Sequence, residues 1–256
     1  MKKIYKKVKS KYKNYGLINL MILILKYPYK RLKWTLALND NTSEIFKTIH
    51  DNRLWSSPES KSGEGSEKNY TQNLRIWLIE NIPKYGIRNV VDAPCGDFNW
   101  MRYVLSDVSV NYIGLDIVGK LIKINKMKYS SSNIIFKKSN IINEAIPDCD
   151  LLIVRDCLFH FSYADINQFL KNIKKTDYKY LLTTSHIVSS DFKNFDIKTG
   201  DFRMIDLFKS PFNFSKDSVL ECINDFPEGH RVQKSLSLIQ KKFVPTNISI
   251  SQPAND

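Results

Sequence analysis

The sequence lacks the signatures of several large classes of protein. Its four cysteines form no C-x-x-C pair, so neither a disulfide framework nor a zinc site is expected, and a reducing cytoplasm fits best. The apolar stretch at residues 17–25 is far shorter than the roughly 20 residues that span a bilayer. There is no internal repeat. What remains is a globular chain with 43% hydrophobic residues, enough for one α/β domain and an appendage.

Acidic residues are missing from the first 39 positions, which hold eleven of the 39 Lys and Arg residues. The rest of the chain therefore carries a net charge of only about +2, so nucleic acid is not the expected ligand of the fold itself. Residues 1–43 are predicted to form a basic amphipathic helical arm. The arm either contacts an anionic membrane at the inner face of the plasma membrane, or packs on the body or on a second subunit of a homo-oligomer.

The body is predicted to begin at residue 44 and to end at 245, followed by a tail at 246–256. Residues 40–70 are polar and turn-rich, which indicates a long loop with a lid-like part at 55–70. Beyond a helix at 71–82, strands and helices alternate. Strands are expected at 88–93, 111–116, 134–138, 151–155, 179–184, 219–223 and 235–241, and helices at 100–105, 119–127 and 164–173. This order predicts a doubly wound, mostly parallel Rossmann-like α/β sheet with an antiparallel edge strand.

Ligands of such sheets bind beyond the carboxyl ends of the strands. The turn after the first strand contains one glycine, Gly96, and not the three of G-x-G-x-x-G, so a pyrophosphate cradle is poorly supported. Asp92 and Asp97 would repel phosphate and attract a cation. S-adenosylmethionine has a cationic ammonium and a cationic sulfonium, so it suits this turn better than NAD. Ala93 and Cys95 complete the expected cofactor loop.

The tips of the next strands supply further polar groups. Asp116 follows Asp92 by 24 positions in the sequence, a separation typical of the carboxylate that accepts hydrogen bonds from ribose hydroxyls. Its neighbour Ile117 is also expected to contact the cofactor. Asn140 and Ile141 follow the third strand, where a short amide side chain either reads the adenine edge or only forms a turn. Arg155 ends the fourth strand and completes the expected cofactor site.

His160 is the main candidate for a catalytic base, because imidazole titrates in the range that proton removal from a hydroxyl requires. Asp156 is the second catalytic candidate, either as the base itself or as a group that orients substrate hydroxyls. A structural histidine is the alternative at position 160. His186, after the fifth strand, is a further candidate for contact with substrate.

Two more groups complete the predicted site. Asp201 and Arg203 lie in a polar loop that suits a sugar or its phosphates, because a guanidinium binds phosphate in a bidentate manner. Trp100 is either a core residue or a wall of the substrate site. Asp156, His160, Asp196 and Asp201 could ligate a divalent metal, but their spacing is not diagnostic, so no metal is assigned.

Together these residues resemble the motifs of class I S-adenosylmethionine-dependent methyltransferases. More narrowly, the chain is similar to a bacterial group of such enzymes associated with capsular and other surface-glycan loci. The resemblance extends from about residue 44 to 241, and Pro94-Cys95 and Asn140 depart from the usual Gly-Cys and acid. The strings that carry it lie at 55 and 59–66, 94–100, 114–118, 155–160, 196–203 and 211–214.

The resemblance implies an O-methyltransferase that uses S-adenosylmethionine to methylate a sugar hydroxyl. Its acceptor would be a nucleotide-sugar or a precursor of a surface polysaccharide. The alternatives are methylation of RNA, a non-catalytic scaffold that binds the same cofactor, and an NAD-linked oxidoreductase. Against RNA, no Asn-Pro-Pro-Tyr-like tetrad follows the fourth strand. Against the oxidoreductase, the glycines of a dinucleotide-binding loop are missing.

Overall fold

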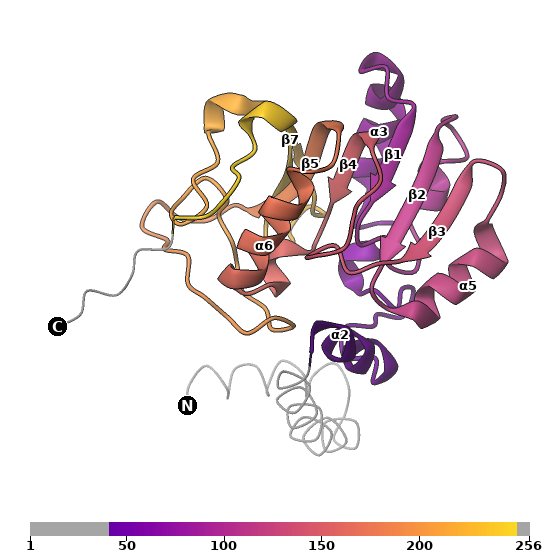
Figure 1. Cartoon of the computed structure of the whole chain (residues 1–256), viewed down its shortest axis with the longest axis horizontal. Helices are drawn as coiled ribbons and strands as arrows, with labels where there is room; N and C mark the ends of the chain where they lie inside the picture. Colours follow the sequence, from indigo (N-terminus) through magenta and orange to yellow (C-terminus); the bar gives the residue numbers. More distant parts are fainter. Residues whose placement is uncertain (1–40, 250–256) are drawn as a thin grey trace.

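A computed structural model describes residues 41–249. Residues 1–40 of the arm predicted at 1–43, and residues 250–256 of the tail predicted at 246–256, lie outside the described residues. Seven strands form one sheet in the order β3-β2-β1-β4-β5-β7-β6 (Figure 1). The strands are β1 (Asn89–Asp92), β2 (Asn111–Asp116), β3 (Ile134–Lys138), β4 (Cys149–Val154), β5 (Tyr178–His186), β6 (Val219–Asn224) and β7 (Lys234–Gln240).

Strands β1 to β5 are parallel, whereas β7 pairs antiparallel with both β5 and β6. The predicted doubly wound sheet with an antiparallel edge is therefore confirmed. The strand order reverses between β1 and β4, and ligands of such sheets bind at this switch point.

The strands alternate their side chains between two cores. Val91, Leu152 and Val154 point into a core covered by α6 (Tyr163–Ile173), while Val90 and Leu151 point into a second core on the other face. The second core is covered by α3 (Gln72–Lys84), α4 (Met101–Val104) and α5 (Gly119–Tyr129). Because both of its faces are buried, the central strand β4 reads as a nearly continuous apolar run.

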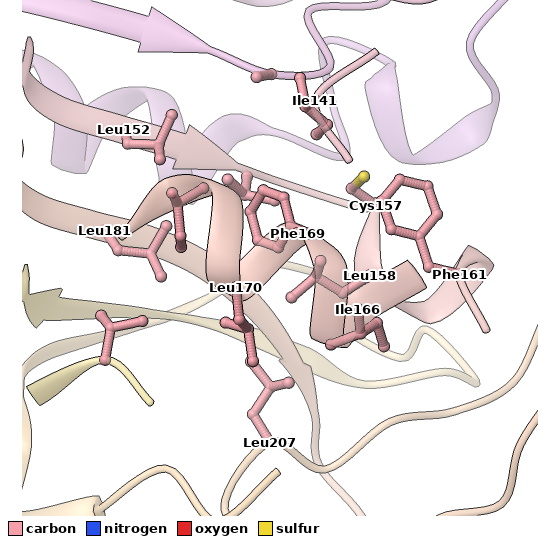
Figure 2. Close-up of a cluster of buried hydrophobic side chains, with 14 of the residues drawn as sticks. Ile141, Leu152, Cys157, Leu158, Phe161, Ile166, Phe169, Leu170, Leu181 and Leu207 are labelled. Atoms are coloured by element: carbon pink, nitrogen blue, oxygen red, sulfur yellow. The ribbon is translucent and has the colours of Figure 1, made fainter. Parts of the chain in front are cut away.

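Figure 2 shows the first core, where the α6 residues Ile166, Phe169 and Leu170 pack against Leu152 and Leu181 of the sheet. The same cluster continues to Cys157, Leu158 and Phe161, which follow β4, and to Ile141, which follows β3. The loops at the strand tips are thus held by the core that supports the sheet, which gives the site a rigid base.

The predicted continuous loop from 40 to 70 is wrong in its first part. Residues Thr42–Asp51 form a helix, α2, which lies beyond the carboxyl ends of the strands (Figure 1). Asn41 caps it by accepting a hydrogen bond from the backbone N–H of Glu44, and Ile45 and Ile49 are buried one turn apart. Within residues 41–249, no helix is long and apolar enough to cross a membrane.

Candidate cofactor and substrate site

A cavity opens at the carboxyl ends of β1, β2, β3 and β4, beneath α2 and the loop that follows it. Four groups of residues line it: Asp92, Pro94, Cys95, Gly96 and Trp100 after β1; Asp116, Ile117, Val118 and Leu121 after β2; Ser139, Asn140 and Ile141 after β3; and Arg155, Asp156, Cys157, His160 and Phe161 after β4. Its cover is formed by Thr42, Phe46, Ile49, His50, Trp55, Lys61, Ser62 and Ser66. The cavity brings together most of the residues predicted to bind cofactor.

The turn after β1 lies close against the cover. Gly96 has a φ of +55°, a left-handed conformation that favours glycine, and a Cβ there would collide with the side chain of Ser62. The Cys95 N–H donates to the carbonyl of Leu115 at 2.8 Å, which fixes the turn to β2. Ala93 is fully buried and does not line the cavity, so its part in the predicted loop is structural.

Asp116 lies at the tip of β2 with its carboxylate aligned by the backbone. One oxygen accepts from the Gly96 N–H at 3.0 Å and the other from the Val118 N–H at 2.8 Å. Burial raises the pKa of Asp116 to about 6, although these hydrogen bonds oppose the shift. Each carboxylate oxygen has a second lone pair, so Asp116 can still accept hydrogen bonds from two hydroxyls of a ligand.

Asp92 is the second buried carboxylate of the cavity. Its Oδ2 accepts from the hydroxyl of Tyr112 at 2.8 Å, and burial raises its pKa to about 7. Burial disfavours the ionised form of a carboxyl group, and a cation placed beside it stabilises that form. Asp92 therefore suits the ammonium of an amino-acid ligand.

The structure assigns Asp97 a different role from the predicted contact with cofactor. Its carboxylate accepts from the Ser60 hydroxyl and from the Lys61 N–H at 2.8 Å, and its own N–H donates to Ser62 at 2.9 Å. Asp97 does not line the cavity. It holds the covering loop onto the turn after β1, because its carboxylate and its backbone N–H are both engaged there.

Asp156 belongs to a buried cluster of two cations and two anions. Lys234 and Arg155 both pair with Asp156, and both also pair with Asp225, at 3.1 Å for Lys234 and 2.9 Å for Arg155. Although burial acts to raise the pKa of Asp156, the neighbouring Arg155 and Lys234 lower it to about 2. The carboxylate is therefore ionised and is held by Arg155 and Lys234. The role of Asp156, as the base or as a group that orients substrate hydroxyls, stays a prediction.

His160 has the geometry of a base. Its Nδ1 lies 2.7 Å from the carbonyl oxygen of Asp201, and because a carbonyl only accepts, Nδ1 carries the proton and Nε2 keeps its lone pair. The ring stacks on Trp55 with centroids 4.2 Å apart. Burial lowers the pKa of His160 to about 4, so the imidazole is neutral at physiological pH.

Three predicted substrate residues are placed away from the cavity lining. Asp201 contributes its backbone carbonyl to His160, and its carboxylate accepts from the Phe202 N–H. The Arg203 side chain is fully buried against the ring of Tyr163, and the His186 Nδ1 accepts from the Ile205 N–H. Arg203 and His186 are enclosed by their neighbours and do not line the cavity, so the structure does not bring them to the predicted substrate site. Trp100 does line the cavity, with Arg155 over its ring.

Helix α2 contributes cavity residues that the sequence did not predict. Phe46, Ile49 and His50 line the cavity from one face of this helix. Their spacing of three and four residues is a helical signal that the polar composition of residues 40–70 obscured. Among residues 41–249, no group of three His, Cys, Asp or Glu side chains is arranged to hold a metal ion.

No protein-family model matches the sequence, and no curated protein matches it either. Solved structures resemble the fold. The mitomycin 7-O-methyltransferase MmcR is 15% identical with a TM-score of 0.53, covering 81% of this chain and 60% of that one. Human N-acetylserotonin methyltransferase in complex with S-adenosylmethionine is 13% identical with a TM-score of 0.50, covering 78% of this chain and 60% of that one.

The S-adenosylmethionine-dependent methyltransferase SibL is 12% identical with a TM-score of 0.50, covering 67% of this chain and 55% of that one. The chain thus spans 55% to 60% of the length of these three structures. It has the fold of class I S-adenosylmethionine-dependent methyltransferases.

Proposed function

We propose that the protein is an S-adenosylmethionine-dependent O-methyltransferase. The observation that carries the proposal is the convergence of Asp92, Asp116 and the neutral imidazole of His160 on one cavity, at the switch point of a methyltransferase fold.

The residues of the cavity fit this cofactor. Asp116 has free lone pairs for the ribose hydroxyls, and Asp92 offers a buried anion for the ammonium. The turn at Gly96 has no room for a Cβ because the Ser62 side chain of the covering loop lies against it. When bound, S-adenosylmethionine supplies an electrophilic methyl group on a sulfonium.

His160 would act on the acceptor. The Nε2 lone pair accepts a hydrogen bond from the acceptor hydroxyl and orients that oxygen for in-line displacement. As the oxygen forms its bond to the methyl carbon, it becomes strongly acidic, and its proton passes to Nε2. A base with a pKa of about 4 is sufficient, because a protonated ether is a far stronger acid. The Asp201 carbonyl stabilises the imidazolium that results, since its partner Nδ1 keeps its proton.

A sugar hydroxyl is the proposed acceptor, either on a nucleotide-sugar or on a surface-polysaccharide precursor. Two observations support a sugar acceptor. The segments 59–66, 94–100, 155–160 and 196–203 resemble those of methyltransferases associated with surface-glycan loci, and the cavity lining near His160 is polar. The basic composition of residues 1–39, outside the described residues, supports peripheral contact with the anionic inner face of the plasma membrane. Homo-oligomerisation through that arm is the alternative role for it.

The test is transfer of a labelled methyl group to a panel of nucleotide-sugars, with bulk RNA as a separate acceptor. Methylation of a sugar by the wild-type protein, lost in His160→Ala, supports the proposal. Methylation of RNA and of no sugar would contradict the sugar acceptor and would identify RNA as the acceptor. Tight cofactor binding with no transfer to any acceptor from either class would favour the scaffold alternative.

A further inference from the structure

A buried acceptor atom in the cavity has no hydrogen-bond partner. The His50 Nε2 is enclosed and unpaired within residues 41–249, and the side chain of His50, on α2, is only 8% exposed. His50 lines the same cavity as Asp116. A buried polar atom without a partner destabilises a protein unless water or a ligand satisfies it.

The protonation of this ring is set by its neighbour. The His50 Nδ1 lies 3.2 Å from Oδ1 of Asp51. An ionised carboxylate only accepts hydrogen bonds, so Nδ1 carries the proton and Nε2 is left with a lone pair. The His50 Nε2 can therefore accept a hydrogen bond from a donor group of the ligand.

The position of His50 indicates which part of the ligand it meets. Asp51 pairs with Lys120 of α5 at 3.4 Å, so the end of α2 that carries His50 lies on the β2 side of the cavity. Phe46, one turn earlier, instead contacts Trp55 and Phe161 on the β4 side. The apolar residues that line the cavity on the β2 side are suited to a flat purine ring: Ile49, Ile117, Val118 and Leu121.

Asn140 is partly engaged at the tip of β3. Its Oδ1 accepts from the Ile142 N–H at 3.1 Å, and its backbone N–H donates to Glu144. The side-chain NH₂ of Asn140 is a donor that matches a purine ring nitrogen. The Nε2 of His50 is the buried acceptor of this cavity that has no partner among the described residues, which matches the purine amino group.

We propose that His50 Nε2 accepts the hydrogen bond of the adenine amino group, so that α2 selects the base of the cofactor. The assignment rests on the proposed function, since it takes S-adenosylmethionine as the ligand. Asn140 and His50 then divide the reading of the base: Asn140 donates from the β3 tip, and His50 accepts from the helix that covers the cavity.

The test is isothermal titration with S-adenosylhomocysteine and with its 6-deamino analogue, in which a hydrogen replaces the amino group. The wild-type protein should bind the amino form about tenfold more tightly, the effect of one buried hydrogen bond. His50→Phe keeps a ring but lacks the acceptor, so it should bind both ligands equally. His50→Gln offers a carbonyl oxygen and should restore part of the preference. Thermal unfolding of each variant confirms that it is folded.

Three outcomes would overturn the assignment. If His50→Phe keeps the tenfold preference, another residue accepts from the amino group and this inference alone fails. If His50→Phe weakens both ligands by the same factor, His50 contacts a different part of the ligand. If the folded wild-type protein binds no S-adenosylhomocysteine, the proposed function fails and the assignment of His50 fails with it.

Discussion

Asp92 and Asp116 lie at adjacent strand tips, and burial raises the pKa of both, to about 7 and about 6. A carboxylate with a raised pKa is partly protonated in the ligand-free protein near neutrality. A cationic ligand prefers the ionised form, so its binding releases the proton. At the scale of single residues, the site is therefore tuned so that ligand affinity depends on pH.

We predict that the affinity for S-adenosylhomocysteine rises between pH 6 and pH 8, as Asp116 and then Asp92 lose their protons. Titrations across this range, in buffers of different ionisation enthalpy, measure both the affinity and the protons released. Asp92→Asn should bind more weakly and should lose most of the pH dependence above about pH 7. An affinity that falls as the pH rises would contradict the assignment of Asp92 to the ammonium.

His160 provides a second prediction at this scale. His160→Ala should lower the rate of methyl transfer by about 10²–10⁴-fold, the usual contribution of a general base. The affinity for S-adenosylhomocysteine should change by less than about threefold, because His160 acts on the acceptor. His186→Gln is the matched control: it alters a buried histidine outside the cavity lining. An equal loss of rate in both variants would indicate a general structural effect and not a base.

The loop after α2 is held over the cavity by a small number of side chains. Asp97 engages Ser60, Lys61 and Ser62, and the Arg155 guanidinium donates to the Gly65 carbonyl at 2.7 Å. Gly65 is required there, because a Cβ would lie only 2.7 Å from a carboxylate oxygen of Asp156. The element that covers the site is therefore ordered by polar contacts at both ends.

Asp97→Ala should release the loop. Amide hydrogen exchange of residues 57–66 should become faster by about 10–100-fold, the loss of hydrogen bonds to one charged group. The affinity for S-adenosylhomocysteine should fall as well, since the loop lines the cavity. Asp107→Ala is the control, because Asp107 is an exposed carboxylate that follows α4. Unchanged exchange in Asp97→Ala would show that other contacts hold the loop.

The elements differ in how far their sequence determines them. Strands such as 111–116 and 134–138 were predicted at their observed limits, because their apolar runs are bounded by polar, turn-forming residues. α2 was missed because it is short and only Ile45 and Ile49 are fully buried. The tips of the strands were predicted from their order along the chain, since parallel strands end at the same edge.

Contacts between distant loops could not be predicted. The segment at 196–203 packs on the one at 158–163, where the Gly200 N–H donates to the His160 carbonyl at 2.7 Å. This packing buries Arg203 and turns the Asp201 carbonyl toward His160. The residue types at 201 and 203 suggested phosphate recognition, but only the tertiary arrangement shows which atoms face the cavity.

At the scale of the whole molecule, the buried charge cluster joins segments that are far apart in the sequence. Arg155 and Asp156 follow β4, Asp225 follows β6, and Lys234 begins β7. The side chains of Asp225 and Lys234 are 0% and 5% exposed. The cluster therefore fixes the antiparallel hairpin to the parallel part of the sheet beside the site.

Asp225→Ala should destabilise the protein by about 3–5 kcal/mol, because it leaves two buried cations with one anion. Urea-induced unfolding measures this loss. Lys120→Ala removes an exposed pair with Asp51 and should cost less than about 1 kcal/mol. A loss of the same size in both variants would show that the cluster contributes no more than a surface pair.

The central claim is that the cavity at the switch point of this fold binds S-adenosylmethionine through Asp116. Isothermal titration of the full chain with S-adenosylhomocysteine tests it most directly, with the wild-type protein compared with Asp116→Asn. We predict micromolar binding at one site per chain, weakened by about tenfold or more in Asp116→Asn, the loss expected for a charged hydrogen-bond acceptor. A folded wild-type protein that binds no S-adenosylhomocysteine, or a variant that binds it equally well, would contradict the claim.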